Sequence, residues 1–203
     1  MNQHFQQVVA TLCLLVISPL LLVISAIIWI VDGSPVIFRQ TRVGRGEREF
    51  TILKFRTMVN GADQQLGAGG KPKSRLTKTG KWLRKSSLDE LPQLVNISRG
   101  EMAFVGPRAC LPEVAANIPP ALRGRFKVLP GVTGLAQVSG RNTVPWSKRL
   151  ELDTEYAQKR STWLDLKILA RTVVVVFFGI GFVPDRNTEE TDDLNLLGKG
   201  SEG

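Results

Sequence analysis

The longest apolar stretch of the chain stands at its beginning. No charged side chain occurs from Met1 to Val31, and Val8–Val31 is a run of 24 residues whose only hydroxyl groups are those of Thr11, Ser18 and Ser25. A straight helix of this length measures roughly 36 Å, which is enough to cross a bilayer core. A secretory signal peptide needs a basic N-terminal region and a small-residue cleavage site, and neither is evident. Because the run is apolar all round, a membrane segment is favoured over a buried helix of a soluble core.

The apolar run is interrupted near its middle at Ser18-Pro19. Proline removes a backbone donor and clashes with the carbonyl four residues earlier, so a kink is expected there, and the Ser18 hydroxyl can bond a freed carbonyl. A kinked helix can span the membrane or return to the same face, and the residues alone leave both courses open. Four arginines just after the run place the following part in the cytoplasm by the positive-inside rule. They are Arg39, Arg42, Arg45 and Arg48.

Alternation between apolar and polar positions replaces the apolar run after the turn cluster Asp32–Pro35. An extended segment at 36–38, a turn at Gly44–Gly46 and the alternating stretch Glu49–Phe55 predict a hairpin close to the membrane surface. The following segment, Gly61–Lys73, is rich in Gly, Gln, Lys and Pro and is expected to form a mobile loop.

Three later segments show helical or irregular patterns. The basic stretch Arg75–Lys85 predicts an amphipathic helix, and its cations equally suit a wall for phosphates or lipid headgroups. Trp146–Arg160 has apolar residues at helical spacing, and the apolar stretch Ile168–Phe182 is too short to span a bilayer, so it predicts a core or interfacial helix. The acidic, polar stretch Asp185–Gly203 is expected to be a tail or a disordered segment, part of which could cover the site.

The most informative stretch surrounds two adjacent carboxylates. Asp89 and Glu90 follow the cations Arg84 and Lys85. A structural interpretation is a capping box, in which Ser87 caps a helix and Glu90 reaches back to it. Pro92 complicates this interpretation because proline suits the first helical turn better than the interior.

The surroundings of the carboxylates favour a chemical role. Gly100–Arg108 reads as a strand that ends in a Gly-Pro turn presenting Arg108, and Leu129–Gly134 and Val138–Asn142 read as glycine-rich turns. Backbone amides in such turns hold phosphate oxygens. Phosphoryl transfer needs a nucleophile or base, cations and usually Mg²⁺ held by a carboxylate, and this chain offers those groups. The groups are suitable for the reaction but do not identify it.

Composition narrows the possible partners. The formal charge of +9, from 27 Lys and Arg against 18 Asp and Glu, favours partners that carry phosphate. The single histidine, His4, makes a zinc site or a Ser/His/Asp triad a poor interpretation, and two distant cysteines do not form a disulfide framework. An alternative is a basic, membrane-anchored scaffold or nucleic-acid-binding protein. The chain has one tyrosine and no aromatic nucleic-acid module, so no nucleic-acid partner is expected.

Seven short motifs in order give the chain a resemblance to the monotopic phosphoglycosyl transferases, the initiating enzymes of bacterial glycan assembly. They cover nearly the whole chain to about Val176, and each is weak alone. The motifs are Arg42-Val43-Gly44, Leu53-Lys54-Phe55-Arg56-Thr57-Met58, Ser87-Leu88-Asp89-Glu90-Leu91-Pro92-Gln93-Leu94, Val105-Gly106-Pro107-Arg108, Pro130-Gly131-Val132-Thr133-Gly134, Gly140-Arg141-Asn142 and Trp163-Leu164-Asp165-Leu166-Lys167-Ile168.

The resemblance implies a reaction and a location. The helix broken at Ser18-Pro19 would be re-entrant, and the enzyme would lie on the cytoplasmic face of the bacterial inner membrane. Asp89 would attack the sugar-bearing phosphate of a UDP-sugar and release UMP, and undecaprenyl phosphate would then accept the phosphosugar, which predicts ping-pong kinetics. Mg²⁺ would sit against Asp89, and Glu90 would act as a base or assist the metal.

The resemblance also assigns cations that bind phosphate. Arg108 and Arg84 match family positions, and Lys54 and Arg141 are supporting cations. One departure is Pro107-Arg108-Ala109, where the family continues Pro-Arg-Pro, and loss of the second proline should loosen this turn.

The predicted fold class is therefore α+β. It comprises a re-entrant membrane helix at 1–33, a cytoplasmic catalytic domain at 34–183 and a polar tail at 184–203. The chain is expected to be a minimal catalytic form with membrane lipid as a partner. No residue selects one sugar, and a homo-oligomer stays open.

Overall fold

The computed structural model describes residues 1–59, 76–140, 143–178 and 192–196, and all structural statements concern these ranges. They form helices and short strands, so the expected mixture of the two is confirmed. In chain order the elements are α1 (Gln3–Asp32), β1 (Ile37–Val43), η1 (Arg45–Glu47), β2 (Glu49–Phe55), α2 (Lys78–Ser86), η3 (Leu88–Glu90), α3 (Gln93–Ser98), β3 (Ala103–Val105), α4 (Pro112–Asn117), η4 (Pro120–Lys127), β4 (Gly131–Thr133), α5 (Leu135–Val138), α6 (Trp146–Lys159) and α7 (Thr162–Phe177).

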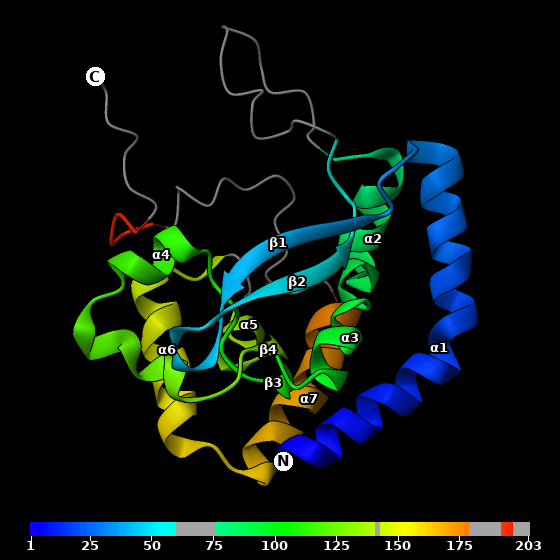
Figure 1. The fold of residues 1–203 in the computed structure, drawn as a ribbon. Coiled ribbons are helices and arrows are strands. Elements are labelled where there is room, and N and C mark those ends of the chain that lie inside the picture. The colour runs from blue at the N-terminus through cyan, green and yellow to red at the C-terminus, as the bar shows by residue number, and fades with distance from the viewer. Residues whose placement is uncertain (60–75, 141–142, 179–191, 197–203) are drawn as a thin grey trace, which may run out of the picture.

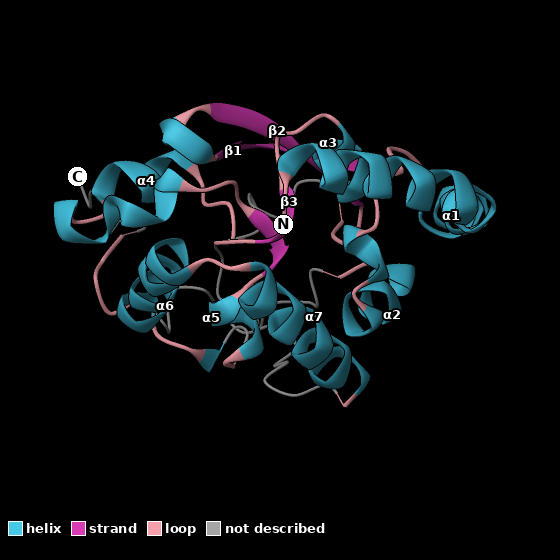
Figure 2. Ribbon diagram, turned by 90° about the horizontal axis from the view of Figure 1, so that it is seen from below, coloured by secondary structure: helices cyan, strands magenta, loops and turns pink. Residues whose placement is uncertain are grey.

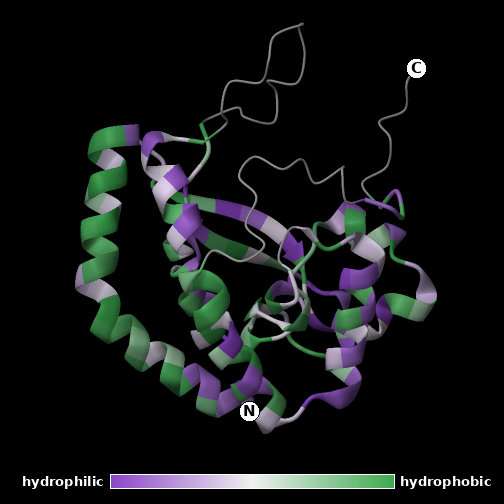
Figure 3. Ribbon diagram, turned by 180° about the vertical axis from the view of Figure 1, so that it is seen from behind, coloured by the Kyte–Doolittle hydropathy of each residue, from purple (hydrophilic) through white to green (hydrophobic). Residues whose placement is uncertain are grey.

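The apolar run forms α1, a helix of 30 residues that is long and apolar enough to cross a membrane. It runs along one side of the molecule and changes direction part of the way along (Figure 1). Pro19 lies inside it, and the Ser18 hydroxyl donates to the Leu15 carbonyl at 2.9 Å. Its outward face is apolar (Figure 3), with Val16 78% exposed and Leu22 70% exposed. Such a face is stable in lipid rather than in water.

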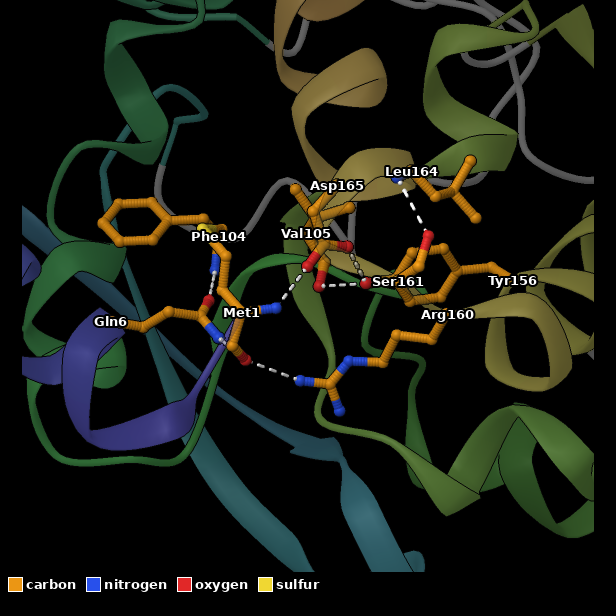
Figure 4. Close-up of polar contacts among 9 residues, drawn as sticks. All are labelled: Met1, Gln6, Phe104, Val105, Tyr156, Arg160, Ser161, Leu164 and Asp165. Atoms are coloured by element: carbon orange, nitrogen blue, oxygen red, sulfur yellow. Dashed lines mark hydrogen bonds and ion pairs between the residues drawn. The ribbon is translucent and has the colours of Figure 1, made fainter.

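The first turns of α1 are bonded to the body of the molecule. The Gln6 side-chain oxygen accepts a hydrogen bond from the Phe104 amide at 3.0 Å. The amino group of Met1 forms an ion pair of 2.9 Å with the buried carboxylate of Asp165 (Figure 4). The Tyr156 hydroxyl donates to that carboxylate at 2.6 Å. These contacts join the start of α1 to β3, α6 and α7.

The last turn of α1 is bonded to the same body. The buried Arg56 donates to the carbonyl oxygens of Asp32, Gly33 and Ser34 at 2.5, 2.8 and 2.6 Å. The carbonyl of the last residue of a helix has no partner inside the helix, and this guanidinium satisfies that of Asp32 together with the two carbonyls that follow it. The Asp32 carboxylate in turn accepts from the hydroxyl and the amide of Thr79 in α2.

The expected hairpin is confirmed. Strands β1 and β2 pair antiparallel from Ile37↔Phe55 to Val43↔Glu49. In Figure 2 the hairpin lies on one side of the molecule, and α5, α6 and α7 lie on the other. Ile52 and Phe55 of β2 are both buried, and because they are three residues apart they lie on opposite faces of the strand. Lys54 follows Ile52 by two residues, so its side chain leaves the same face as that of Ile52.

The second sheet is a parallel pair, β3 and β4, with Ala103 opposite Gly131 and Val105 opposite Thr133. Leu129–Gly134 was expected to be a glycine-rich turn, and this interpretation is wrong for its centre, which forms β4. A side chain at Gly131 would collide with the backbone nitrogen of Gly106. The close approach therefore requires glycine and fixes where β3 ends.

Apolar clusters fix the elements on either side of the carboxylate pair. Ile97 of α3 packs with Ala10 of α1 and Ile52 of β2. Leu83 of α2 packs with Ile28 of α1 and Phe55 of β2. Burying side chains of this size contributes about 1.5–3 kcal/mol each. The segment between α2 and α3 is therefore held at both ends.

The C-terminal part of the chain differs in detail from the expectation. The predicted helix at Trp146–Arg160 is confirmed by α6, but α7 begins at Thr162 rather than at Ile168. In the tail, Leu196 is 1% exposed and packs in an apolar cluster with Leu150 and Val114. Residues 192–196 are therefore packed against the body rather than free. The predicted loop at Gly61–Lys73 lies outside the described residues.

Candidate active site

The two carboxylates lie in the short connection between α2 and α3. Ser87 ends α2 in the left-handed conformation, with φ 58°, and its amide donates to the Arg84 carbonyl at 3.2 Å. The Ser87 side chain makes no capping bond, and the Glu90 carboxylate bonds two cations. The capping-box interpretation is therefore wrong. Asp89 and Glu90 follow in the single turn η3.

Glu90 is the centre of the charge cluster. Its Oε1 atom lies 2.7 Å from Lys54 Nζ of β2 and 2.7 Å from Arg108 Nη2, which follows β3. The side chains of Lys54 and Glu90 are each 16% exposed, whereas that of Arg108 is 51% exposed. Charged hydrogen bonds of this kind are strong where water is largely excluded. Arg108 therefore keeps part of its guanidinium free for an incoming anion.

Asp89 differs from its neighbour although both are acidic. It is 8% exposed and has no hydrogen-bonded partner within the described residues. Burial and the charge of Glu90 raise the pKa of Asp89 to about 6, against the opposing effect of Lys54, Arg84 and Arg108. Burial by itself would raise the pKa of Glu90 as well. The positive charges of Arg108 and Lys54 outweigh this effect and hold the pKa of Glu90 well below its usual range. Asp89 thus takes up a proton first, and Glu90 stays ionised.

Further cations surround this pair. Arg84 Nε donates to the Thr57 hydroxyl at 3.0 Å, which holds the guanidinium close to the dyad. Arg42 was predicted only as a charge flanking the membrane and as part of a motif, and it lies close to Arg108. Burial and the charge of Arg108 lower the pKa of Arg42 to about 10. The predicted site residue Arg141 lies outside the described residues.

The turn that carries Arg108 is held by the β3–β4 pair. The Gly106 amide donates to the Thr133 carbonyl at 2.9 Å, and the Gly131 amide donates to the Pro107 carbonyl at 2.9 Å. The Gly131 amide is therefore not one of the phosphate-binding donors that were expected in this segment. The structure brings together Asp89, Glu90, Lys54, Arg84 and Arg108, all of which the sequence had singled out.

The donor set fits one mode of Mg²⁺ binding. The described residues contain no group of three or more acidic, histidine or cysteine side chains that would form a protein-only metal cage. Mg²⁺ is commonly bound by one or two carboxylates together with substrate phosphates and water. Asp89, whose oxygens make no hydrogen bond to any described residue, fits this mode, whereas Glu90 is already bonded to two cations.

A carboxylate with a raised pKa among cations suits a substrate that carries phosphate, and the exposed apolar helix α1 suits attachment to a membrane. The fold and the site thus have the features of a membrane-associated enzyme whose substrate carries phosphate.

The chain belongs to the bacterial sugar transferase family, whose sequence pattern matches residues 1–179. It is 41% identical over 181 residues to the sugar transferase EpsL of Bacillus subtilis, with 89% of each chain covered. It is 38% identical over 196 residues to the exopolysaccharide production protein ExoY of Rhizobium meliloti, covering 89% of this chain and 87% of ExoY.

A longer relative has a more specific name. The UDP-glucose:undecaprenyl-phosphate glucose-1-phosphate transferase of Escherichia coli is 41% identical over 175 residues, which are 82% of this chain and 38% of that protein. Membership of the family makes the chain a sugar transferase and decides against the scaffold alternative.

Proposed function

We propose that this enzyme transfers a sugar 1-phosphate from a UDP-sugar to undecaprenyl phosphate and releases UMP. The name of the Escherichia coli relative supports this donor and acceptor. The site supports it independently, because both substrates are phosphates and the described cations converge on one carboxylate pair. The name of the relative ExoY, an exopolysaccharide production protein, supports a role in bacterial polysaccharide assembly.

The observation that supports the mechanism is the difference in hydrogen bonding between the two carboxylates. Glu90 is bonded to Lys54 and Arg108, whereas Asp89 has no hydrogen-bonded partner within the described ranges. Asp89 is therefore the group whose oxygen is available for attack. Its pKa of about 6 leaves it mostly ionised at neutral pH and makes it more basic than an ordinary aspartate.

The proposed reaction proceeds in two displacements at phosphorus. An Asp89 oxygen forms a bond to the sugar-bearing phosphorus as the bond from that phosphorus to the bridging oxygen breaks, and UMP leaves with the bonding electron pair. A phosphate oxygen of undecaprenyl phosphate then attacks the same phosphorus, and the Asp89 carboxylate leaves. A carboxylate is a good leaving group from an acyl phosphate, so the phosphosugar on Asp89 is reactive toward the acceptor. Because UMP leaves before the acceptor reacts, the two displacements give ping-pong kinetics.

We assign Glu90 a positioning role rather than that of a base. A carboxylate whose pKa is held well below the usual range is a weak base. Its contacts orient Lys54 and Arg108, which then face the charge that develops on the phosphate oxygens. Arg84 lies on the α2 side of the same pair.

We further propose Mg²⁺ as the cofactor, with Asp89 as its protein ligand. Bound there with the donor diphosphate, the ion would lessen the repulsion between carboxylate and phosphate. The cations of the protein supply the rest of this neutralisation, and Arg108 is the most accessible of them.

We propose that α1 enters the cytoplasmic membrane and returns to the cytoplasmic face. A helix that spans a bilayer has its ends on opposite sides, about 30 Å apart. Here Gln6 near the start bonds to Phe104, and Asp32 at the end bonds to Thr79, so both ends contact one charged body. A body of this polarity does not extend through hydrocarbon. The bend of α1 (Figure 1) and Pro19 suit such a course.

The deciding experiment follows UMP release from a panel of UDP-sugars by purified enzyme in nanodiscs with undecaprenyl phosphate and Mg²⁺. We expect release with at least one sugar and loss of turnover by more than about 1000-fold in Asp89→Asn. Glu151→Gln is the matched control, because Glu151 lies on the exposed face of α6 and its side chain is 57% exposed. Turnover by Asp89→Asn at the wild-type rate would refute Asp89 as nucleophile.

A separate experiment tests the course of α1. A cysteine placed at Asn2 in a cysteine-free background is treated with a membrane-impermeant maleimide in intact spheroplasts and in inverted vesicles. Labelling only in inverted vesicles is expected. Labelling in spheroplasts would place the N-terminus outside and overturn the re-entrant course, with no consequence for the proposed chemistry.

A further inference from the structure

A buried ion pair lies behind the turn that presents Arg108. Arg125 belongs to η4 and Asp153 to α6, and Arg125 Nη2 lies 3.0 Å from Asp153 Oδ2. Their side chains are 3% and 4% exposed. Neither residue contacts the carboxylate dyad, and the proposed mechanism does not use them.

This pair is incompletely satisfied. Arg125 Nε and Nη1 and Asp153 Oδ1 are buried and have no hydrogen-bond partner among the residues that the structure describes. Burial raises the pKa of Asp153 to about 6 against the effects of Arg125 and Arg149. Removing two charges from water is costly, and a buried pair with unpaired atoms is often less stable than apolar side chains of similar volume. A contribution to the free energy of unfolding therefore does not explain why this pair is present.

Arg125 also contacts the backbone of the turn that carries Arg108, and this contact suggests what the pair does. The same Arg125 Nη2 atom donates a short hydrogen bond to the carbonyl oxygen of Arg108. This carbonyl is the next one after that of Pro107, which the Gly131 amide holds. Two successive carbonyls of the turn are thus fixed, and with them the direction in which the Arg108 side chain leaves the backbone.

The residue after Arg108 makes this restraint more important. A proline there would confine the backbone of Arg108 to extended conformations, but this chain has Ala109. Alanine leaves the peptide of Arg108 free to rotate unless another group holds its carbonyl. A small hollow lined by Ala109, Arg125 and Phe126 lies beside the turn, so packing alone does not fill that side.

We propose that Arg125, held by Asp153, is a positioning residue that fixes the Arg108 carbonyl and so aims the Arg108 guanidinium at Glu90 and at the donor phosphate. Asp153 holds the guanidinium of Arg125 in place, and Arg125 supplies the restraint that Ala109 does not. The inference rests on the proposed function, because its effect is measured as transfer of the sugar phosphate.

The test replaces the pair with apolar side chains, Arg125→Met/Asp153→Leu, so that neither member of the pair is left as a buried charge without the other and the protein keeps its fold. We expect a melting temperature close to that of wild type and a kcat/KM for the UDP-sugar lower by about 10- to 100-fold, since a displacement of about 1 Å at a substrate-binding group has this effect. Adding Ala109→Pro should restore most of the loss, whereas Ala109→Pro alone should change activity less than about twofold.

A double-mutant cycle with Arg108→Lys separates positioning from a general structural role. If the pair acts through Arg108, its replacement should change kcat/KM much less in the Arg108→Lys background than in wild type. An equal loss in both backgrounds, wild-type activity in the double variant, or a loss that parallels unfolding would each overturn the inference. Absence of UMP release from the wild-type enzyme would instead contradict the proposed function.

Discussion

The two neighbouring carboxylates should respond to neutralisation with opposite changes in stability. Asp89→Asn and Glu90→Gln each remove one negative charge and keep nearly the same shape. Asp89 is buried beside a like charge and has no hydrogen-bonded partner among the described residues, whereas Glu90 is bonded to Lys54 and Arg108. Neutralising Asp89 should therefore stabilise the protein, and neutralising Glu90 should destabilise it.

The magnitude follows from the structure. A pKa of about 6 for Asp89, against the ordinary value of 3.8, corresponds to about 3 kcal/mol that ionisation costs the folded state above that pKa. An asparagine amide next to Lys54 and Arg84 recovers only part of this, so we expect a gain of roughly 1–2 kcal/mol and a melting temperature higher by roughly 2–8 °C for a chain of this size. Glu90→Gln leaves the buried Lys54 without the negative charge bonded to it and should cost about 2 kcal/mol or more.

The pH dependence gives an internal check. The folded-state pKa of Asp89 is raised, so the cost of its ionisation is fully present above pH about 6 and disappears as the pH falls toward 4. The stability difference between Asp89→Asn and wild type should shrink over that interval. Thermal unfolding in detergent followed by tryptophan fluorescence measures it. An Asp89→Asn variant that is less stable than wild type at pH 7.5 would refute the assignment of strain to Asp89.

Three further predictions address the chemistry and the frame of the site. UMP release in the absence of lipid acceptor should fall about tenfold per pH unit below about 6, because protonated Asp89 cannot attack; a flat profile from pH 5 to 8 would contradict this. Asn96→Ala should lower stability by about 2–4 kcal/mol in thermal unfolding, since the buried Asn96 accepts from the Leu53 amide at 3.1 Å and donates to the Thr51 carbonyl at 2.7 Å; a loss below 1 kcal/mol would show that these bonds are replaced. Arg56→Gln should destabilise by about 2 kcal/mol or more and speed proteolysis after Asp32, because it removes the hydrogen bonds to the carbonyls of Asp32, Gly33 and Ser34; unchanged proteolysis would contradict this role.

Much of the fold was predictable from local patterns. The run Val8–Val31 required an apolar helix, and alternation in Glu49–Phe55 together with Gly44–Gly46 predicted the hairpin that pairs β1 with β2. The spacing in Trp146–Arg160 predicted α6. These predictions succeed because side-chain periodicity follows directly from helix and strand geometry and needs no knowledge of the rest of the chain. The capping box failed because Ser-x-x-Glu also occurs where a helix ends.

The candidate site was predictable as a set of residues but not as an arrangement. The motifs identified Asp89, Glu90, Lys54 and Arg108, whereas the sequence did not show that Glu90 holds both cations. No sequence pattern singled out Arg125, because its partners are a carbonyl 17 residues away and a carboxylate on another helix.

The sequence by itself therefore determined the apolar helix, the hairpin and the list of chemical groups, since each depends on neighbours within a few residues. Only the tertiary structure decided which carboxylate is paired and which is available. That choice depends on the pairing of β3 with β4 and on the packing of α3 against β2, which bring Lys54 Nζ and Arg108 Nη2 each to 2.7 Å from Glu90 Oε1. Burial and charge then act over these short distances and separate the pKa values of two adjacent, chemically similar groups.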